Sequence, residues 1–358
     1  MTTIYDPKDP LYLDEADVRD ELTRVYDLCH GCRLCFKFCT SFPTLFDMID
    51  QFDDQDAGRL TPAQQDQVVD ECFQCKLCYI NCPYIPELHE WNLDFPRLML
   101  RADAMRHANG HVKAKEKVTN QMMGRTDMLG TAATTTAPLA NKVLEAKPGS
   151  FVRKAVSALT GVSAVRLLPP YARQRFSTWF KKRPKVTLGK SQGSVTVFPT
   201  CLVEYQEPQI GKDLVRVYER NGIDCSHTEA DCCGAPWLHS GDIDKFTKVA
   251  RKNVTTLAAE VRKGTDIVVP QPTCGYVLKK DYLDYVGGPD AELVAEHTYD
   301  AAEYLMKVHK GDDTLLDSHF DGDVPEKVTY HTPCHLRAQN IGFKSRDLMK
   351  LTGTKVKL

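Results

Sequence analysis

The sequence predicts a multidomain α+β protein, in which an N-terminal α-helical module is followed by an α/β module with a parallel sheet. The chain has 358 residues, 42% of them hydrophobic, which is enough for two or more domains with separate cores. Its 14 cysteines fall into two groups, eight before residue 83 and six after residue 200. The pattern around the first group favours helices, whereas strands alternate with helices around the second. We therefore expect modules at 1–110 and 191–358, connected by a basic, partly helical segment at 111–190.

Composition excludes several classes of protein. Cysteine makes up about 4% of the chain, well below the content of small secreted disulfide scaffolds. The first residues lack the basic and then apolar pattern of a signal peptide, and no apolar run approaches the roughly 18 residues that span a bilayer. We expect a cytoplasmic protein, either free or peripheral at the inner face of the cell membrane, whose thiols bind metal or do chemistry.

The formal net charge of −2 hides an uneven distribution. Residues 1–100 carry 8 basic and 19 acidic side chains, whereas residues 101–200 carry 18 and 4. No acidic residue occurs from 146 to 203, and aromatic residues such as Trp179 are interleaved with the basic ones. The basic residues of this stretch are Lys147, Arg153, Lys154, Arg166, Arg173, Arg175, Lys181, Lys182, Arg183, Lys185 and Lys190. Residues 131–143 are expected to form a polar connection leading into a short helix.

Three roles are open for this basic segment. It can wrap the acidic first module, dock an acidic partner protein, or lie on an anionic membrane surface. Binding to nucleic acid is not expected, because no recognition motif accompanies the charge and the flanking modules are acidic.

The first module contains two cysteine runs with the same spacing, C-x2-C-x2-C-x3-C, flanked by predicted helices. Apolar residues at helical spacing predict a helix over 14–28, before the first run. Pro62 after Thr61 predicts the start of a short helix that leads to the second run. A further helix is predicted after the second run, ending near Gly110.

The spacing predicts that the two runs exchange ligands. Three thiolates separated by two residues each can bind three corners of one [4Fe–4S] cube, but the fourth cysteine is too far along the chain to close the same cube and serves the other. The predicted ligand sets are Cys29, Cys32, Cys35 and Cys82 for one cluster, and Cys72, Cys75, Cys78 and Cys39 for the other. Sulfur donors in sets of four select iron–sulfur or zinc over hard cations. Zinc pairs and disulfides are the alternatives, and two full copies of the run disfavour both.

These runs and helices resemble the helical two-cluster ferredoxin module found in fumarate reductase and heterodisulfide reductase subunits. The resemblance implies electron transfer, with the eight cysteines as cluster ligands. One difference is Thr40, which follows Cys39 where the run ordinarily has proline. Because eight cysteines complete two clusters, we interpret His30 and His89 as packed or surface residues rather than iron ligands.

The second module alternates strands and helices. Strands are predicted within residues 194–201, 223–229 and 266–274, and amphipathic helices over 208–222 and 242–264. This order implies right-handed βαβ units and a parallel sheet. Sites in such sheets form outside the carboxyl ends of the strands, which is where the motif cysteines of this module fall.

Short motifs hold these cysteines. Cys201 and Cys274 each follow a strand in the sequence P-T-C, and Cys232-Cys233-Gly234 follows the strand between them. The glycine allows the backbone of the cysteine pair to approach a cluster closely. The pattern C…CCG…PTC resembles the cysteine-rich CCG domain of heterodisulfide reductase, of the C subunit of anaerobic glycerol-3-phosphate dehydrogenase and of the glycolate oxidase iron–sulfur subunit. With the two ferredoxin runs before it, the resemblance covers nearly the whole chain.

An internal repeat follows the first CCG motif. Residues 194–225 are echoed by residues 327–358, which aligns Cys201 with Cys334. The family domain occurs twice, so Cys334 is expected to open a second copy. At the spacing of the first copy, the second Cys-Cys-Gly would fall beyond the last residue. We therefore expect a CCG domain that is truncated at its C-terminus, with a complete first copy and an interrupted second copy.

The predicted metal ligands of this module are Cys201, Cys232, Cys233, Cys274 and Cys334. The family often has a further cysteine three residues before Cys274, where this chain has Gln271. The four cysteines of the first copy suffice for a third iron–sulfur cluster or a zinc ion, and metal-free thiols lining a cleft are the alternative. Cys225 is expected to be a buried apolar residue. His331 and His335 flank Cys334 and are candidates either for hydrogen bonds to a cluster or for capping and surface roles.

Two functions fit these motifs. In the first, a separate flavoprotein dehydrogenase oxidises a substrate, and this chain passes the electrons through two [4Fe–4S] clusters and the CCG site to a quinone or protein acceptor. No G-x-G-x-x-G follows a predicted strand, so a flavin or nicotinamide is expected on another chain. In the second, the CCG site is catalytic, and Cys232 and Cys233 reduce a disulfide as in heterodisulfide reductase. A scaffold with structural or redox-sensing clusters is a third alternative.

Overall fold

The computed structural model describes four stretches of the chain, which are residues 5–184, 186, 191–311 and 316–358. Lys185 and Lys190, two of the basic residues noted above, lie outside them. In these stretches no helix combines the length and the apolar character needed to cross a membrane.

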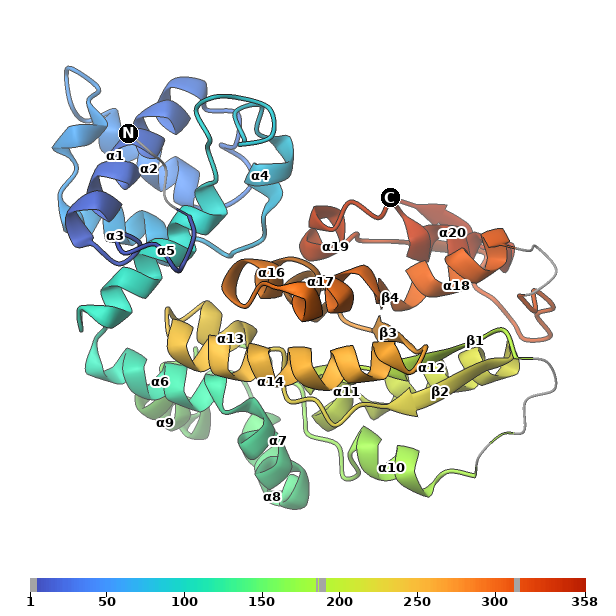
Figure 1. Cartoon of the computed structure of the whole chain (residues 1–358). Helices are drawn as coiled ribbons and strands as arrows, with labels where there is room; N and C mark the ends of the chain where they lie inside the picture. Colours follow the sequence, from blue (N-terminus) through green and yellow to red (C-terminus); the bar gives the residue numbers. More distant parts are fainter. Residues whose placement is uncertain (1–4, 185, 187–190, 312–315) are drawn as a thin grey trace. The chain divides into compact units, whose positions relative to one another are not determined.

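Packing divides the chain into two compact units (Figure 1). The first unit comprises Met1–Val112 and Pro236–Phe246, and the second comprises Lys113–Ala235 and Thr247–Leu358. The first unit holds the eight N-terminal cysteines, and the second holds the parallel sheet and the other six. The three modules expected above are divisions of the sequence, and they stay a prediction.

In the first unit, short helices surround one apolar core. The helices are α1 (Glu15–Cys32), α2 (Ser41–Ile49), η1 (Ala57–Arg59), α3 (Pro62–Asp70), α4 (Leu77–Asn81) and α5 (Phe95–Ala108). Asp14 caps α1 through its side chain, and Thr61 with Gln64 forms a capping box at the start of α3. The three helices predicted for this region are present, and α1 continues far enough to include Cys29 and Cys32.

The second unit contains a four-stranded parallel sheet with the strand order β2-β1-β3-β4, whose strands are labelled in Figure 1. The strands are β1 (Gly193–Val197), β2 (Ile223–His227), β3 (Asp266–Val269) and β4 (Thr298–Asp300). The helices between these strands along the chain are α11 (Thr200–Tyr205), α12 (Pro208–Arg220), α13 (Ala235–Leu238), α14 (Ile243–Arg262), α15 (Pro272–Tyr276), η2 (Val277–Asp281), α16 (Tyr282–Tyr285) and α17 (Pro289–Glu296). Most of α13 and the first turn of α14 fall within Pro236–Phe246 of the first unit. The predicted parallel sheet is confirmed, and β4 is a further strand that the sequence pattern did not reveal. Cys225 is buried in the core of this unit, as expected.

The segment before β1 is more helical than its sequence predicts. It forms α6 (Ala114–Gly124), α7 (Thr126–Thr135), α8 (Ala137–Leu144), α9 (Phe151–Thr160) and α10 (Phe176–Lys182). The prediction of a polar connection at the start of residues 131–143 is wrong, because residues 131–135 belong to α7. Gly130 explains why, since a Cβ there would lie 2.5 Å from the ring of Tyr205. Close packing against α11 therefore supports α7 where local propensity does not.

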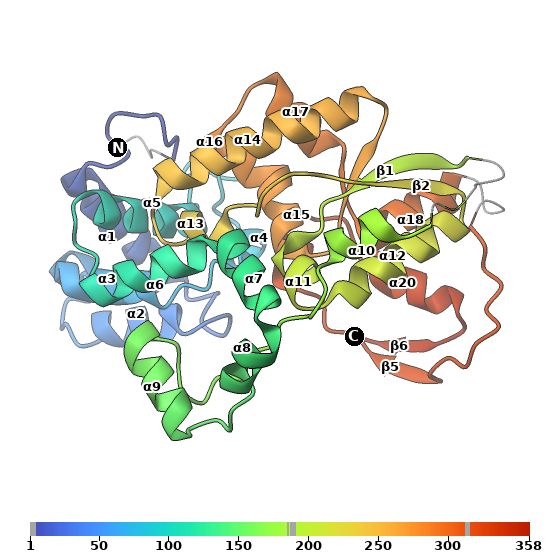
Figure 2. The ribbon, with the colours of Figure 1, turned by 90° about the horizontal axis from the view of Figure 1, so that it is seen from below.

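The C-terminal part repeats the beginning of the sheet region. After α18 (Ala301–Gly311), β5 (Lys327–Thr329), α19 (Cys334–Ala338), α20 (Lys344–Leu351) and β6 (Lys355–Lys357) follow in the order of β1, α11, α12 and β2. β5 and β6 pair in parallel with Val328 opposite Val356 (Figure 2), as β1 and β2 pair with Val195 opposite Cys225. The repeat inferred from the sequence is thus a repeat of strand, two helices and strand.

Candidate functional site

Four thiols of the first unit line one small cavity. Cys29 and Cys32 lie in the last turn of α1, and Arg33 then adopts a left-handed conformation with φ of 53° that redirects the chain. The cavity is lined by Cys29, Cys32, Cys35 and Cys82, together with Leu34, Phe42, Pro83, Tyr84 and Leu93. Burial raises the pKa of the Cys29 thiol, and the thiols of Cys35 and Cys82 raise it further. Cys82 of the second run therefore lies with three cysteines of the first.

The second run makes a similar turn. Gln74 and Lys76 adopt left-handed conformations with φ of 54° and 64°. Burial raises the pKa of the Cys72 thiol to about 12; the Gln74 N–H and Lys76 lower it, and the thiols of Cys39 and Cys75 raise it. The Cys39 thiol is thus close enough to act electrostatically on Cys72 of the second run, and it acts on Cys35 of its own run as well.

The two sets of thiols adjoin each other. Burial raises the pKa of the Cys78 thiol, and Cys72 and then Cys35 raise it further. Within the described part of the chain, no three Cys, His, Asp or Glu side chains are grouped so that they could hold a single metal ion. A zinc ion draws sulfur donors to about 2.3 Å, whereas a [4Fe–4S] cube binds each thiolate at a separate iron. Two complete runs of four sulfur donors fit two such cubes.

The two histidines near the runs have other partners. His30 is buried, and its Nε2 lies 2.9 Å from Oδ1 of Asp50. His89 accepts a hydrogen bond from the Trp91 N–H through Nδ1 at 3.1 Å and packs edge-on against Tyr84. These contacts agree with the interpretation of both residues as packed side chains.

In the second unit, four thiols gather beyond the carboxyl ends of β1, β2 and β3. Cys201 lies in α11 directly after β1, Cys232 and Cys233 follow β2, and Cys274 lies in α15 after β3. A hydrogen bond with Cys232, together with burial, raises the pKa of Cys201, whereas the bonds with Cys201 and Cys233 lower the pKa of Cys232. Bonds with Cys232 and Cys274 raise the pKa of Cys233. The thiols thus form a continuous chain in the order 201, 232, 233 and 274.

Cys334, the fifth predicted ligand, lies at the start of α19. This helix packs against α15, and Nδ1 of His335 lies 2.9 Å from the Thr273 hydroxyl, next to Cys274. The second repeat is therefore adjacent to the helix that carries Cys274.

The turn before Cys201 is strained. Thr200 has φ of 62°, in the left-handed region that β-branched residues rarely adopt. The residue is buried, and its hydroxyl accepts a hydrogen bond from the Val203 N–H at 3.4 Å. Such strain persists where the surrounding structure fixes the backbone, and it is common at functional sites.

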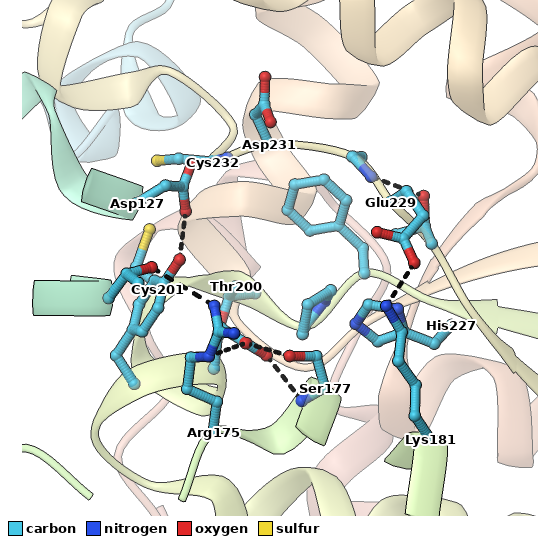
Figure 3. A pocket seen from close by; sticks show the side chains of 17 residues that line it. Asp127, Arg175, Ser177, Lys181, Thr200, Cys201, His227, Glu229, Asp231 and Cys232 are labelled. Carbon is cyan, nitrogen blue, oxygen red and sulfur yellow. Dashed lines mark hydrogen bonds and ion pairs between the residues drawn. The ribbon is translucent and has the colours of Figure 1, made fainter. Parts of the chain in front are cut away.

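A cavity of about 350 Å³ opens beside Cys201 and Cys232 (Figure 3). Its polar wall residues are Asp127, Thr131, Arg175, Ser177, Lys181, Thr200, Glu204, Tyr205, His227, Thr228, Glu229 and Asp231. Lys181 pairs with Glu229 at 2.9 Å, and burial lowers the pKa of His227. Both ring nitrogens of His227 are buried without a hydrogen-bond partner among the described residues. The cavity is at the small end of the range for ligand sites, and its wall is mostly polar.

One wall of this cavity comes from the segment that the sequence presented only as a basic connection. Asp127 of α7 accepts hydrogen bonds from the Cys232 N–H at 2.8 Å and from the Tyr205 hydroxyl at 3.0 Å (Figure 3). Burial raises the pKa of Asp127. Arg175 and Lys181 reach the same cavity from the start and the interior of the α10 region. These residues could not be assigned to a site from the sequence, where the only local signal is an isolated acid, Asp127, in a segment rich in basic residues.

Comparison with known proteins agrees with this arrangement. Residues 195–279 match the family model of the CCG cysteine-rich domain. The C subunit of anaerobic glycerol-3-phosphate dehydrogenase from Escherichia coli K12 is 28% identical over 239 residues, covering 66% of this chain and 58% of that protein. Lactate utilization protein A of Shouchella clausii is 32% identical over 148 residues, covering 40% and 58%. The B subunit of fumarate reductase (CoM/CoB) from Methanothermobacter marburgensis is 30% identical over 167 residues, covering 46% and 30%. No solved structure matches the chain.

The chain therefore contains a CCG cysteine-rich domain and is related to iron–sulfur subunits of oxidoreductases. This confirms the resemblance on which the sequence interpretation relied. The chain spans less than two thirds of the length of each of these relatives.

Proposed function

We propose that this chain is an electron-transfer subunit that passes electrons between a flavoprotein dehydrogenase and a quinone or protein acceptor. The route runs through two [4Fe–4S] clusters, held by the crossed sets of N-terminal cysteines, and the CCG site. The observation that carries the proposal is that Cys82 of the second run lines one cavity with three cysteines of the first run. The exchange of the fourth cysteine between two runs is typical of proteins with two [4Fe–4S] clusters, whereas two separate zinc sites do not require it.

The residues around the thiols support one-electron transfer. A bound cluster supplies the reversible uptake of one electron, and the chain supplies the ligands and the environment that sets the potential. The Tyr84 N–H points at the Cys82 sulfur, with N and S 3.4 Å apart, and the Gln74 N–H bonds to Cys72. Hydrogen bonds to sulfur stabilise the more negative reduced state and raise the reduction potential.

Anaerobic purification followed by iron and sulfide analysis tests this function. We expect about eight irons from the N-terminal module and EPR signals from two interacting reduced clusters. A third cluster at the CCG site would add to this number, whereas a zinc ion there would appear in the metal analysis without additional sulfide. A chain with one zinc for every four cysteines and no acid-labile sulfide would refute electron transfer.

We further propose that the α8–α9 region contacts an anionic membrane surface. Phe151 and Leu159 of α9 are 86% and 76% exposed, and Leu167 beyond it is 81% exposed. Lys147 and Lys154 lie beside these side chains, and no acidic residue occurs from 146 to 203. In contrast, Arg175, Lys181 and Arg183 form ion pairs with Glu204, Glu229 and Glu219 of their own unit. Exposed apolar side chains beside basic ones are typical of surfaces that lie on anionic lipid.

Sedimentation with lipid vesicles tests the membrane contact. We expect the chain to bind vesicles that contain phosphatidylglycerol more tightly than neutral vesicles, with binding weakened by salt. The double substitution of Phe151 and Leu159 by Glu should abolish sedimentation. Val118→Glu is the control, because it also replaces an exposed apolar side chain by one negative charge. Equal sedimentation with neutral and anionic vesicles would exclude this role and leave an acidic partner protein as the occupant of the face.

A second candidate function is reduction of a disulfide at the CCG site. The polar cavity beside Cys201 and Cys232 favours it, because a quinone ring and tail would meet a mostly polar wall. The reaction requires two electrons, delivered through the N-terminal clusters, and two protons from solvent; the S–S bond breaks and two thiols form. Cys232 and Cys233 are the proposed catalytic residues.

The two functions are separable by purifying the chain without partners. If it reduces disulfides with a low-potential electron donor, and Cys232→Ser removes this activity but keeps the N-terminal clusters, the second function holds. If clusters are reduced and reoxidised by a flavoprotein and a quinone while disulfides are untouched, the first function holds.

A further inference from the structure

The backbone of the Cys232–Cys233 loop is held by one buried amide side chain. Asn253 lies in the middle of α14 and is fully buried. Its Oδ1 accepts a hydrogen bond from the Asp231 N–H at 2.9 Å, and its Nδ2 donates to the carbonyl oxygens of Asp231 at 3.2 Å and Cys232 at 3.0 Å. Asparagine is a poor helix former and is seldom fully buried. Three loop contacts explain its presence at this position.

A buried tyrosine continues the same network. The hydroxyl of Tyr282 donates to the Cys233 carbonyl oxygen at 3.0 Å and accepts from Nδ2 of Asn253 at 3.0 Å. Tyr282 is fully buried, and burial followed by the neighbouring Cys233 raises its pKa. The backbone carbonyls of both motif cysteines are therefore bonded to side chains of two different helices.

Cys274 and Tyr282 lie on consecutive helical segments, and a π-helical turn between them changes the angle at which their side chains leave the helix axis. The π-helical turn η2 lies between α15, which contains Cys274, and α16, which begins at Tyr282. Eight residues of regular α-helix would place the two side chains about 80° apart around the axis. A π turn absorbs one residue and reduces the difference to about 20°. One helix face can thus present both Cys274 and the Tyr282 hydroxyl to the loop.

We propose that Asn253 and Tyr282 are positioning residues that fix the Cys232–Cys233 backbone so that Cys232 faces the cavity and Cys233 faces Cys274. Cys232 lines the cavity, whereas Cys233 does not and is 2% exposed. Without the two side chains, the loop carbonyls and the Asp231 N–H would lose buried partners, and the loop would shift to find others. The inference rests on the proposed function, because it assigns the two thiols separate roles at one redox site.

Tyr282→Phe is the variant of choice, because it removes one hydroxyl and keeps the ring. Tyr218→Phe is its matched control: Tyr218 is also buried, lies in the same unit, and donates its hydroxyl to the Ala301 carbonyl oxygen at 2.6 Å. Asn253→Asp keeps the acceptor for the Asp231 N–H and removes the donors to the two carbonyls. Thermal unfolding of all variants measures the loss of stability that follows from removing a buried, hydrogen-bonded hydroxyl at either tyrosine.

Two readouts follow the loop itself. In the metal-free full-length chain, iodoacetamide labelling with peptide mapping gives the alkylation rate of each thiol. We expect the ratio of the Cys232 rate to the Cys233 rate to fall roughly 3- to 10-fold in Tyr282→Phe and Asn253→Asp. In the metal-loaded chain, we expect a chelator to remove the CCG-site metal about 10-fold faster and the EPR or absorption signature of that site to change. Tyr218→Phe should leave both readouts unchanged.

The outcomes separate this inference from the proposed function. If Tyr282→Phe and Tyr218→Phe lower stability equally and neither changes the alkylation ratio, the hydroxyl is merely structural and the inference is overturned. If the wild-type CCG site binds no metal and transfers no electron, the proposed role of that site fails. The alkylation ratio still decides, in that case, whether Asn253 and Tyr282 position the two thiols. A changed ratio with unchanged N-terminal cluster signals supports the inference.

Discussion

Paired cysteine replacements distinguish crossed from uncrossed ligation of the two N-terminal clusters. In the structure, Cys82 lines one cavity with Cys29, Cys32 and Cys35, and the Cys39 thiol is within electrostatic range of Cys72 and of Cys35. With crossed ligation, Cys39→Ala and Cys75→Ala damage the same cluster. With uncrossed ligation, each substitution damages a different one.

The expected magnitude follows from counting ligands. The double variant of Cys39 and Cys75 should lose about four irons and one reduced EPR signal under crossed ligation, but about eight irons and both signals under uncrossed ligation. The double variant of Cys32 and Cys82 should also lose about four. The double variant of Cys32 and Cys75 loses both clusters under either scheme and calibrates the assay.

Iron and acid-labile sulfide are measured after anaerobic reconstitution, with circular dichroism to verify that each variant is folded. The difference from the wild type removes any contribution of the CCG site. If the Cys39 and Cys75 variant matches the calibrating variant, the crossed arrangement is wrong. In that case the proximity of Cys39 to Cys72 reflects only the contact between two separate clusters.

Three further results are expected. Gly130→Ala should lower the free energy of unfolding by about 1–3 kcal/mol, because its Cβ would overlap the Tyr205 ring; unchanged denaturant unfolding would show that the ring moves freely. Thr200→Gly should raise thermal stability by about 1 kcal/mol by removing left-handed strain, and a clear loss would show that the hydroxyl matters more than the strain. Burial raises the pKa of Cys35 to about 12, so this thiol is protonated below that pH in the metal-free chain. Its alkylation rate should therefore rise about tenfold per unit as the pH increases from about 8 to 11, and a plateau within that range would contradict the shift.

The helices of the first unit could be predicted because the residues that start and stabilise each helix lie within or next to that helix. The capping residues of α1 and α3 and the apolar spacing along α1 lie within single helices, and each predicted the element that forms. The crossed ligand sets stay a prediction, which rests on the three residues that separate the third and fourth cysteines of each run. The left-handed residues Arg33, Gln74 and Lys76 could not be predicted, because none is glycine or asparagine. Their conformations are imposed by the turn that the cysteines make.

The second unit was predictable where strands and motifs coincide. The P-T-C turns after β1 and β3 and the CCG loop after β2 placed four thiols at one sheet edge, because parallel strands end on the same side. β4 is only three residues long, Thr298–Asp300, and lacks a periodic pattern of its own. Asn253 could not be singled out either, because its partners lie 21 and 22 residues away along the chain.

The cavity wall shows where prediction from sequence stops. The bond between Asp127 and the Cys232 N–H joins residues 105 positions apart, and nothing near Asp127 indicates it. The cysteines are constrained by the geometry of their site, whereas Asp127, Arg175 and Lys181 are held by partners on the cavity wall, which are Cys232 and Tyr205 for Asp127, Glu204 for Arg175 and Glu229 for Lys181. In a related chain with a different electron acceptor, we therefore expect the thiols to stay and the wall contributed by α7 and the α10 region to change. Exchanging that segment between two such chains should transfer acceptor preference, while exchange of the CCG loop should not.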